Sequence, residues 1–182
     1  MIVIRSRAPA ETRAIGEALG RALGLAAPHA PAGGRTGARG QSGPGAVLAI
    51  DGPLGAGKTC LVQGLARGLG VSGYIRSPTF VIVHEHPGPV PLHHVDLYRL
   101  TAADLDGLGL EELFDGPGVT AIEWAERAEA TPPGGRLGLL PPEHLRVSVA
   151  FGPADDDREI SLEARGDRYR RIVEDIACAF SR

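Results

Sequence analysis

Residues 46–63 read Ala-Val-Leu-Ala-Ile-Asp-Gly-Pro-Leu-Gly-Ala-Gly-Lys-Thr-Cys-Leu-Val-Gln. The apolar run from Val47 to Ile50 has the length of a buried parallel strand. Residues 52–59 then match the phosphate-loop pattern GxxxxGK[ST], and the periodic segment at 60–69 predicts a helix directly after it. The stretch therefore predicts a strand, a phosphate-binding loop and a helix in the order that this motif requires.

The glycines of the loop give it a physical basis for binding phosphate. Three glycines within six residues let successive backbone N–H groups turn toward a polyphosphate, because no Cβ atoms stand in the way. The N-terminus of the following helix adds a partial positive charge. In this motif the lysine reaches the β- and γ-phosphates, and the next hydroxyl binds the bridging Mg²⁺, which assigns Thr59 to the metal. The predicted nucleotide-binding residues are Gly52, Leu54, Gly55, Ala56, Gly57, Lys58, Thr59 and Cys60.

Lys58 is the only lysine in a chain whose lysines and arginines together number 19. A planar guanidinium could not replace a compact ammonium inside such a loop. A sequence that uses arginine everywhere else therefore keeps a lysine at the one position where the motif needs it. We predict that Lys58 takes part in the chemistry of the bound phosphates.

Length and composition predict a single domain over residues 1–182, since 43% apolar residues are enough to bury a hydrophobic core. The net charge of −3 provides no field that would hold nucleic acid by itself, so an RNA-linked role would need a partner to supply phosphate contacts. Two cysteines make no disulfide framework and are typical of a reducing compartment. The sequence shows neither a signal-peptide core nor a membrane-length apolar run, so we expect a cytoplasmic protein without membrane association.

Hydrophobic periodicity predicts further elements on both sides of the loop. They are a strand at residues 1–5, a helix at 10–25, an antiparallel hairpin of strands at 146–151 and 159–163, and a helix at 167–180 with its arginines on a solvated face. Residues 26–45 are rich in Gly and Pro and lack large apolar side chains, which predicts a flexible insertion. The fold class that follows is α/β: a three-layer sandwich like that of P-loop NTPases, with a mostly parallel central sheet, a C-terminal antiparallel hairpin and flanking helices.

The middle of the chain alternates predicted strands and turns. Residues 75–83 run into a strand, with Ser-Pro-Thr at 77–79 forming a polar turn at its start. This turn is either an ordinary proline turn or a switch in which the Thr79 hydroxyl senses the γ-phosphate or its attacking water, and the residues alone leave both open. A turn is predicted at 84–89, strands at 91–100 and 118–124, and a helix at 105–114.

Two carboxylates lie at the ends of these last two strands, Asp96 in the first and Glu123 in the second. Because α/β sheets bind ligands at the carboxyl ends of their parallel strands, we predict that one acid serves Mg²⁺ and the other positions water or nucleotide. Trp124 is expected in the core. The four histidines between residues 84 and 94 do not predict a zinc site, because no cysteine or ordered carboxylate spacing completes one.

Taken together, these motifs resemble the TsaE (YjeE) family of small bacterial P-loop ATPases. The matching motifs, in order, are the loop at 52–59, Ser-Pro-Thr-Phe at 77–80, Asp-Leu-Tyr-Arg-Leu at 96–100, Gly-Leu-Glu-Glu at 109–112 and Glu-Trp at 123–124. A phosphate loop alone is shared by many families, whereas this series is quite specific. The resemblance covers nearly all of the chain outside residues 26–45.

The resemblance implies a role in the threonylcarbamoyl modification of the adenosine next to the anticodon of tRNA, together with the partners TsaB and TsaD. In the family, TsaD carries the transfer chemistry, and the ATPase binds and hydrolyses ATP to allow repeated turnover. It also implies that Thr59 and Glu123 bind Mg²⁺, that Thr79 belongs to a nucleotide-sensing switch, and that Asp96 is needed for hydrolysis. The expected cofactors are therefore ATP and Mg²⁺, and tRNA is expected to be reached through the complex.

The chain departs from the family pattern at three places. Ala125 follows Glu-Trp where the family has proline, Cys60 follows the loop threonine, and the insertion at 26–45 is longer than the family's link. None of the three removes a charged or hydroxyl group from the predicted site.

Two other functions are compatible with a phosphate loop. A small-molecule kinase on the same fold would carry an arginine-rich lid, whereas the arginines here are scattered along the sequence. A non-catalytic module gated by nucleotide would bind without turnover, and the lack of an Asn-Lys-x-Asp motif argues against GTP in particular. Multiple-turnover phosphate release separates the ATPase from the module, and phosphoryl transfer to an added acceptor identifies the kinase.

Overall fold

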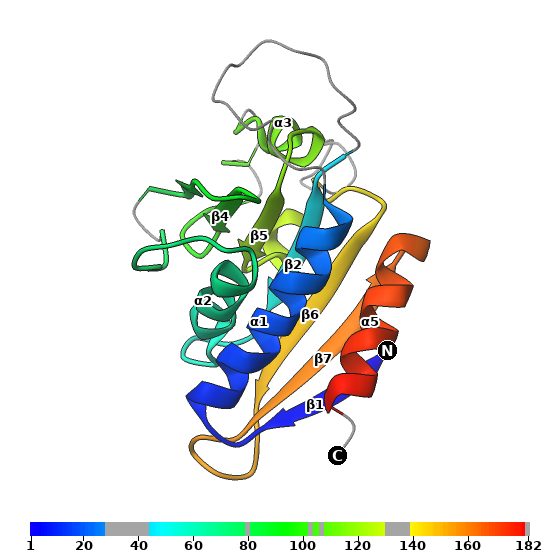
Figure 1. The fold of residues 1–182 in the computed structure, drawn as a ribbon. Coiled ribbons are helices and arrows are strands. Elements are labelled where there is room, and N and C mark those ends of the chain that lie inside the picture. Colours follow the sequence, from blue (N-terminus) through cyan, green and yellow to red (C-terminus); the bar gives the residue numbers. More distant parts are fainter. Residues whose placement is uncertain (28–43, 79–80, 102–103, 106–107, 130–138, 181–182) are drawn as a thin grey trace.

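The computed structural model describes residues 1–27, 44–78, 81–101, 104–105, 108–129 and 139–180. The strands are β1 Ile2–Ser6, β2 Ala46–Asp51, β3 Val83–His86, β4 Leu92–Asp96, β5 Val119–Glu123, β6 His144–Phe151 and β7 Arg158–Arg165. The helices are α1 Pro9–Ala26, α2 Lys58–Gly68, α3 Leu110–Asp115, α4 Glu126–Glu129 and α5 Asp167–Phe180. Within these residues the strands form one seven-stranded sheet in the order β1-β7-β6-β2-β5-β4-β3 (Figure 1).

The middle of the sheet is parallel and both edges are antiparallel. Strand β2 pairs in parallel with β5 and β6, and β5 pairs in parallel with β4. The hairpin of β6 and β7 is antiparallel, as are the pairs β1 with β7 and β3 with β4. The predicted α/β class, with its mostly parallel central sheet and C-terminal antiparallel hairpin, is confirmed.

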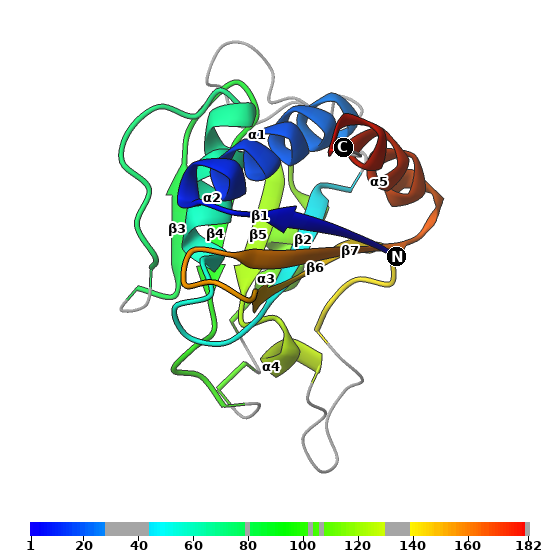
Figure 2. The ribbon, with the colours of Figure 1, turned by 90° about the horizontal axis from the view of Figure 1, so that it is seen from below.

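Helices cover both faces of the sheet and make the predicted three layers. The long helices α1, α2 and α5 lie on one face, and α3 and α4 lie on the other (Figure 2). Alternate residues of β2 point to opposite faces, so that Leu48 belongs to the larger cluster under the long helices and Val47 to the smaller cluster. The continuous apolar strand predicted at 47–50 is therefore buried from both sides.

Glycines bring α1 and α2 into backbone contact. Gly16 and Gly20 of α1 face Gly64 and Gly68 of α2, and a Cβ on Gly20 would lie only 2.2 Å from the carbonyl oxygen of Leu65. No residue larger than glycine fits such a crossing unless the helices move apart. Because α2 begins inside the phosphate loop, this contact also fixes the position of the loop relative to α1.

The predicted strand at 75–83 and the predicted turn at 84–89 are wrong in their boundaries. None of the described residues between 75 and 82 lies in a strand, and residues 83–86 form the edge strand β3. His84 and Glu85 of this strand are exposed, so its sequence lacks the apolar alternation that signals a strand. Backbone pairing with β4 defines it instead.

The helix predicted at 105–114 begins late, at Leu110. The preceding residue, Gly109, has a left-handed backbone with φ of 65° and forms the N-cap of α3. A left-handed residue cannot continue a right-handed helix, so the helix cannot extend toward residue 105 through this position.

Arg168 corrects the expectation that the arginines of the last helix only face solvent. Residues 28–43 of the predicted insertion lie outside the described part of the chain, but the residues at its two ends are described. The Arg168 guanidinium donates hydrogen bonds to the carbonyl oxygens of Ala26 at 2.7 Å, Pro44 at 3.0 Å and Gly45 at 3.2 Å. The start of α5 thereby ties the end of α1 to the start of β2.

Tyr169 provides a hydrogen-bond acceptor for a buried backbone N–H of β2. Its hydroxyl accepts a hydrogen bond from the N–H of Val47 at 2.9 Å inside the core. Replacing Tyr169 by phenylalanine is expected to lower the free energy of unfolding by about 1–3 kcal/mol, because a buried N–H would lose its partner. Urea denaturation measures this loss, with Tyr74→Phe as the matched control, since the Tyr74 side chain is 75% exposed. Equal stability of the two variants would contradict the assignment.

Tyr169 should also make the stability of the protein depend on pH in the alkaline range. Burial raises the pKa of Tyr169 above its unfolded value. The folded state therefore holds this proton more tightly, so its stabilising contribution is complete below the ordinary tyrosine pKa of about 10. It is lost as the pH rises through the folded pKa. We expect the stability of Tyr169→Phe to fall less steeply than that of the wild type in urea titrations above this pH.

Candidate functional site

A hollow of about 340 Å³ opens at the carboxyl ends of the parallel strands, over the predicted phosphate loop. The loop follows β2, and the last residues of β4 and β5 lie beside it. The hollow is lined by Leu54, Gly55, Gly57, Lys58, Thr59, Ser77, Asp96, Tyr98, Glu123 and Trp124. The topology thus gathers residues that are up to 70 positions apart in the chain (54 to 124) at one edge of the sheet.

The loop backbone uses its glycines as the motif predicts. Gly52, Gly55 and Gly57 have positive φ values of 139°, 77° and 102°, which residues with a Cβ rarely adopt. At Gly52 a Cβ would also lie 2.2 Å from the carbonyl oxygen of Val149 on β6. Gly57 is the N-cap of α2 and supplies no side-chain cap. The first N–H groups of the helix are therefore not capped by a side chain, which suits them to an anion.

Lys58 bridges the loop and an aromatic ring. Its Nζ donates to the carbonyl oxygens of Gly52 at 2.6 Å and Pro53 at 2.9 Å, and lies 3.7 Å from the ring centroid of Trp124. Burial lowers the pKa of Lys58, while the charges of nearby acids, Glu123 first among them, oppose the shift. The ammonium is thus held at the centre of the site by two carbonyls and a π face.

Arg158 at the start of β7 supports the loop from outside the hollow. Its Nε donates to the carbonyl oxygen of Ala56 at 2.8 Å, and its guanidinium lies 4.9 Å from the ring centroid of Phe151. Nη1 of the same side chain donates to the carbonyl oxygens of Asp155 and Asp157 in the hairpin turn. The C-terminal hairpin therefore acts as a brace for the phosphate loop.

Thr59 and Glu123 meet across the hollow. The Thr59 hydroxyl donates to Oε2 of Glu123 at 3.1 Å, and Nε2 of His94 lies 2.9 Å from Oε1 of the same carboxylate. Both His94 and Glu123 are buried. In the described part of the chain, no group of three or more His, Cys, Asp or Glu residues could hold a metal ion. A metal here would take one hydroxyl and one carboxylate from the protein, which suits Mg²⁺ because it keeps waters and binds phosphate oxygens.

Asp96 lies directly opposite Glu123 in the β4–β5 ladder. One of its oxygens accepts a short hydrogen bond from the Ser77 hydroxyl, and the other accepts from the backbone N–H of Tyr98 at 2.9 Å. The side chain is thereby fixed at the end of β4 with its carboxylate in the lining of the hollow. Thr79, the predicted switch residue, lies outside the described residues.

Three of the predicted nucleotide-binding residues do not line the hollow. They are Gly52, Ala56 and Cys60. The Cys60 thiol points toward α1 and donates to the carbonyl oxygen of Pro9 at 3.3 Å, while Arg13 donates to its sulfur at 3.4 Å. The side chain that replaces the family's usual residue after the loop threonine therefore serves the contact between helices.

The expectation that Trp124 lies in the core is wrong. Its side chain is only partly buried and forms one wall of the site. Its backbone is left-handed, with φ of 61°, which turns the chain sharply at the end of β5. The following Ala125 donates its N–H to the carbonyl oxygen of Ile50 at 3.3 Å, a bond that the family's proline could not make. The Tyr98 ring packs against the indole in a tilted arrangement, with 4.9 Å between ring centroids.

Sequence reasoning missed Ser77, Tyr98 and His94 as parts of the site. Ser77 and Tyr98 stand inside two of the motifs that carry the resemblance, so their place in those motifs was an available signal. His94 gave no such signal, because only the pairing of β4 with β5 brings it to Glu123.

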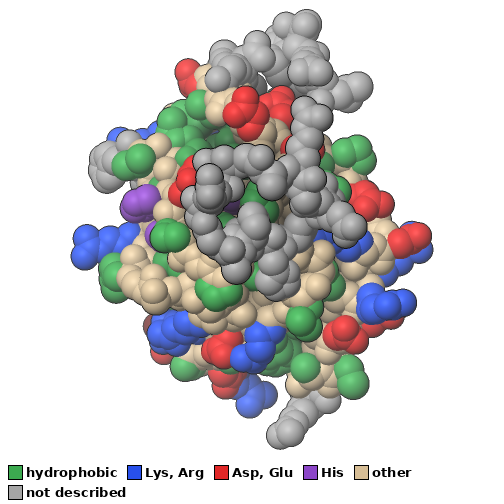
Figure 3. All heavy atoms as spheres, turned by 45° about the horizontal axis from the view of Figure 1, so that its top comes forward, with side chains coloured by type: hydrophobic (Ala, Val, Ile, Leu, Met, Phe, Trp, Pro, Cys, Tyr) green, Lys and Arg blue, Asp and Glu red, His purple; other side chains and the backbone are tan. Residues whose placement is uncertain are grey.

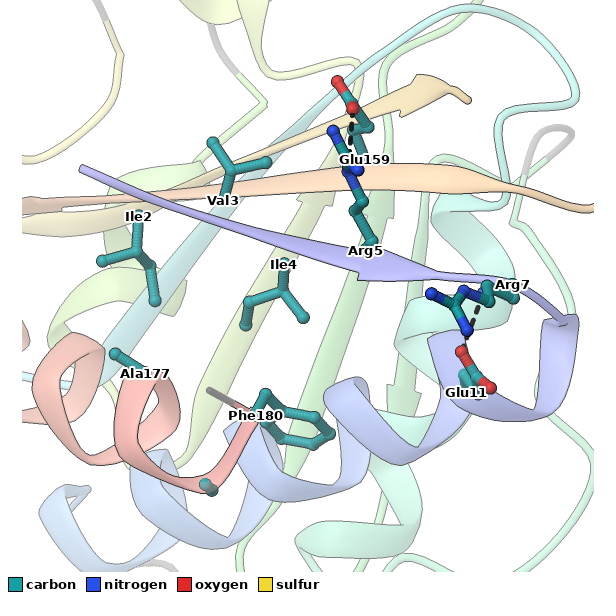
Figure 4. A pocket seen from close by; sticks show the side chains of 10 residues that line it. Ile2, Val3, Ile4, Arg5, Arg7, Glu11, Glu159, Ala177 and Phe180 are labelled. Carbon is teal, nitrogen blue, oxygen red and sulfur yellow. Dashed lines mark hydrogen bonds and ion pairs between the residues drawn. The ribbon is translucent and has the colours of Figure 1, made fainter. Parts of the chain in front are cut away.

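A larger hollow, of about 810 Å³, lies at the far edge of the sheet between β1, α1 and α5 (Figure 4). Its apolar wall includes Ile2, Ile4 and Phe180. Arg5 forms an ion pair with Glu159 at 3.4 Å, and a Glu11 oxygen accepts a hydrogen bond from the backbone N–H of Arg7 at 2.7 Å. This larger hollow contains none of the phosphate-loop residues. The candidate site is therefore not the larger of the two hollows.

A parallel-centred α/β sheet with a glycine-rich loop between β2 and α2 defines the class of P-loop NTPase-like proteins. A family model described as "Threonylcarbamoyl adenosine biosynthesis protein TsaE" matches residues 6–160. The chain belongs to the TsaE family, and the resemblance predicted from its motifs is confirmed. None of the described helices is long and apolar enough to cross a bilayer.

Individual relatives support the same assignment. The chain is 42% identical over 135 residues to the "tRNA threonylcarbamoyladenosine biosynthesis protein TsaE" of Bacillus subtilis, a match that covers 74% of this chain and 79% of that one. It is 50% identical over 93 residues to the protein of that name from Synechocystis, covering 48% of this chain and 59% of the relative. The crystal structure of YdiB from Bacillus subtilis superimposes with a TM-score of 0.72 at 33% identity, covering 98% of this chain and 95% of the other.

Proposed function

We propose that this protein is the ATP-binding and slowly hydrolysing component of tRNA threonylcarbamoyladenosine formation, acting with TsaB and TsaD on the adenosine next to the anticodon. The observation that carries the proposal is the meeting of Thr59 with Glu123, with Asp96 beside them, over a phosphate loop in a member of the TsaE family. The fold alone would not support this, because P-loop folds host many functions.

The loop supplies the groups that a triphosphate needs. Backbone N–H groups of the glycine-rich segment and the uncapped start of α2 would surround the phosphates. Lys58 would exchange its two carbonyl partners for the β- and γ-phosphate oxygens. Such an exchange also draws the ammonium away from the Trp124 ring, which makes this single tryptophan a reporter of binding.

The charges of the site favour a nucleotide that arrives with a cation. The hollow is lined by one ammonium, from Lys58, and two carboxylates, from Asp96 and Glu123. A bare triphosphate would be repelled by both carboxylates. Mg²⁺ on Thr59 and Glu123 would remove this repulsion and, when bound, would neutralise charge that develops on the phosphates.

Hydrolysis would also use Asp96, next to Glu123 on the neighbouring strand. Asp96, which accepts hydrogen bonds from Ser77 and from the N–H of Tyr98, would orient an attacking water. Thr79 would assist it, as the family resemblance implies. Among the described residues that line the hollow there is no arginine. Arg158 lies beside the loop, but its guanidinium donates to the carbonyl oxygens of Ala56 and of the hairpin turn. The arginine that stabilises the transition state in many P-loop enzymes would then come from a partner protein, so we expect slow turnover by the isolated chain.

The distribution of surface charge favours contact with tRNA through the partners. Acidic and basic side chains are interspersed on the face shown in Figure 3, without an extended basic patch among its described residues. The whole chain carries a net charge of −3, whereas binding of nucleic acid depends on cationic contacts to phosphates. The protein would then act on tRNA modification through nucleotide-dependent changes in its partners.

The test compares ATP hydrolysis by the wild type and by Glu123→Ala, each alone and with purified TsaB, TsaD and tRNA. We expect a rate near background alone, a clear rise with the partners, and a loss of about 100-fold on substitution, because the metal would lose its carboxylate. Glu174→Ala, an exposed acid on α5, should behave as wild type.

Each rival function predicts a different result. If nucleotide binds but the partners raise no multiple-turnover phosphate release, the chain is a nucleotide-gated module. If phosphate appears on an added small-molecule acceptor, the chain is a kinase, and the proposed role is wrong.

A further inference from the structure

His94 and Glu123 share the face of the sheet that α2 covers. In the parallel ladder His94 lies opposite Ala121, and Asp96 lies opposite Glu123. His94 therefore pairs with the residue two positions before Glu123 on the neighbouring strand. Side chains two residues apart on a strand point to the same face. Ala121 opposite His94 is small and leaves room for the ring to reach across to Glu123.

The Glu123 carboxylate is held from two sides, one for each oxygen. His94 Nε2 lies 2.9 Å from Oε1, and the Thr59 hydroxyl donates to Oε2 at 3.1 Å. A carboxylate only accepts hydrogen bonds, so Nε2 carries the proton of this contact. The other ring nitrogen, Nδ1, is buried without a hydrogen-bond partner among the described residues. A bare lone pair there is less costly than an unpaired N–H, so the neutral tautomer that donates from Nε2 fits the site.

We propose that His94 is a positioning residue that fixes the Glu123 carboxylate in the orientation needed for Mg²⁺, an inference that rests on the proposed metal role of Glu123. The imidazole is fully buried, so it offers no surface that solvent or a ligand in the hollow could contact. It acts through Glu123 alone. A glutamate has three rotatable bonds, and without the donor on Oε1 the carboxylate would be free to turn away from Thr59.

The experiment measures ADP binding by calorimetry, with Mg²⁺ and with excess EDTA, and takes the ratio of the two affinities as the magnesium gain. Phenylalanine at 94 keeps a ring but has no donor, so His94→Phe is expected to lower the gain by about 10–100-fold while affinity in EDTA stays unchanged. His94→Gln keeps an amide N–H near the position of Nε2 and should restore most of the gain. His94→Asn is too short to reach Oε1 and should behave as the phenylalanine variant.

The matched control is His93→Ala, on the same strand but on the opposite face, where the ring lies 3.3 Å from the carbonyl oxygen of Pro117. It should keep the full magnesium gain. If His94→Phe does not fold, as judged by urea denaturation, the comparison of His94→Asn with His94→Gln decides the question.

The outcomes separate this inference from the proposed function. If the wild type shows a magnesium gain and the variants without a donor keep it, His94 only fills space and the positioning role is wrong. If all substitutions at 94 lower the gain equally, including glutamine, packing and not the donor is responsible, and the inference also fails. If the wild type itself shows no magnesium gain, the metal role of Glu123 is wrong, and both proposals fall together.

Discussion

Gly20→Ala is expected to lower the free energy of unfolding by about 2–3 kcal/mol, the cost of an overpacked contact between rigid elements. The added Cβ would lie 2.2 Å from the carbonyl oxygen of Leu65 and 2.9 Å from the Cα of Gly68. Backbone atoms cannot rotate away as a side chain can, so α1 and α2 must separate. Because α2 starts in the phosphate loop, we also expect weaker nucleotide binding.

The matched control is the same substitution one turn further along α1. At Gly24 an added Cβ would meet only side-chain atoms, Leu69 Cδ2 at 3.3 Å and Val90 Cγ2 at 3.7 Å. Gly24→Ala is therefore expected to change stability by less than about 1 kcal/mol, and the higher helix propensity of alanine favours a gain. Urea denaturation of the two variants measures the contrast. Similar stabilities would show that the helices tolerate separation and that the glycine contact is unimportant.

Lys58→Arg is expected to weaken ATP binding about 1000-fold, although the charge is kept. Two charge-assisted contacts to phosphate are each worth about 1.5–3 kcal/mol, and a guanidinium cannot place its donors where the ammonium of Lys58 would reach both phosphates. A planar guanidinium would also lose the contacts of the buried Lys58 ammonium, which lies between two loop carbonyls and the Trp124 ring. The measurement is the change in Trp124 emission on titration with ATP and Mg²⁺.

Two further variants make the result specific. Arg67→Lys is the reverse exchange at an exposed position of the same helix and should leave ATP binding unchanged. Lys58→Met removes the charge and keeps an unbranched side chain of nearly the same volume, so a loss similar to that of Lys58→Arg would assign the effect to the ammonium. Should Lys58→Arg fold and bind ATP as the wild type does, the interpretation of this lysine as a phosphate ligand is wrong.

The fold was largely predictable because its strongest local signals coincide with its main elements. The phosphate loop lies between a four-residue apolar run and a periodic helix, and the hairpin of β6 and β7 and the final helix have clear periodicity. The errors fell where local pattern and structure diverge. Edge strand β3 carries exposed polar residues, and its position depends on backbone pairing with β4. Helix α3 starts only at Leu110, after a left-handed glycine.

The candidate site was predictable in composition but not in its arrangement. The motif names Lys58 and Thr59 because binding a phosphate demands those groups at that spacing, and strand ends point to Asp96 and Glu123. Their distances depend on which strands become neighbours. The order β2-β5-β4 brings Glu123 to the hydroxyl of Thr59, and it places Asp96 opposite Glu123.

The sequence by itself therefore determined the class of fold, the family and the chemical groups of the loop, since these follow from short segments whose spacing is fixed by covalent geometry. Only the tertiary structure decided that Trp124 covers Lys58, that Arg158 braces the loop from the hairpin, and that His94 contacts Glu123. Each of these contacts joins segments that are distant in the chain. Their partners include ring faces and backbone carbonyls, which cannot be recognised from a pattern of residue types. These contacts are therefore defined only by strand pairing and packing.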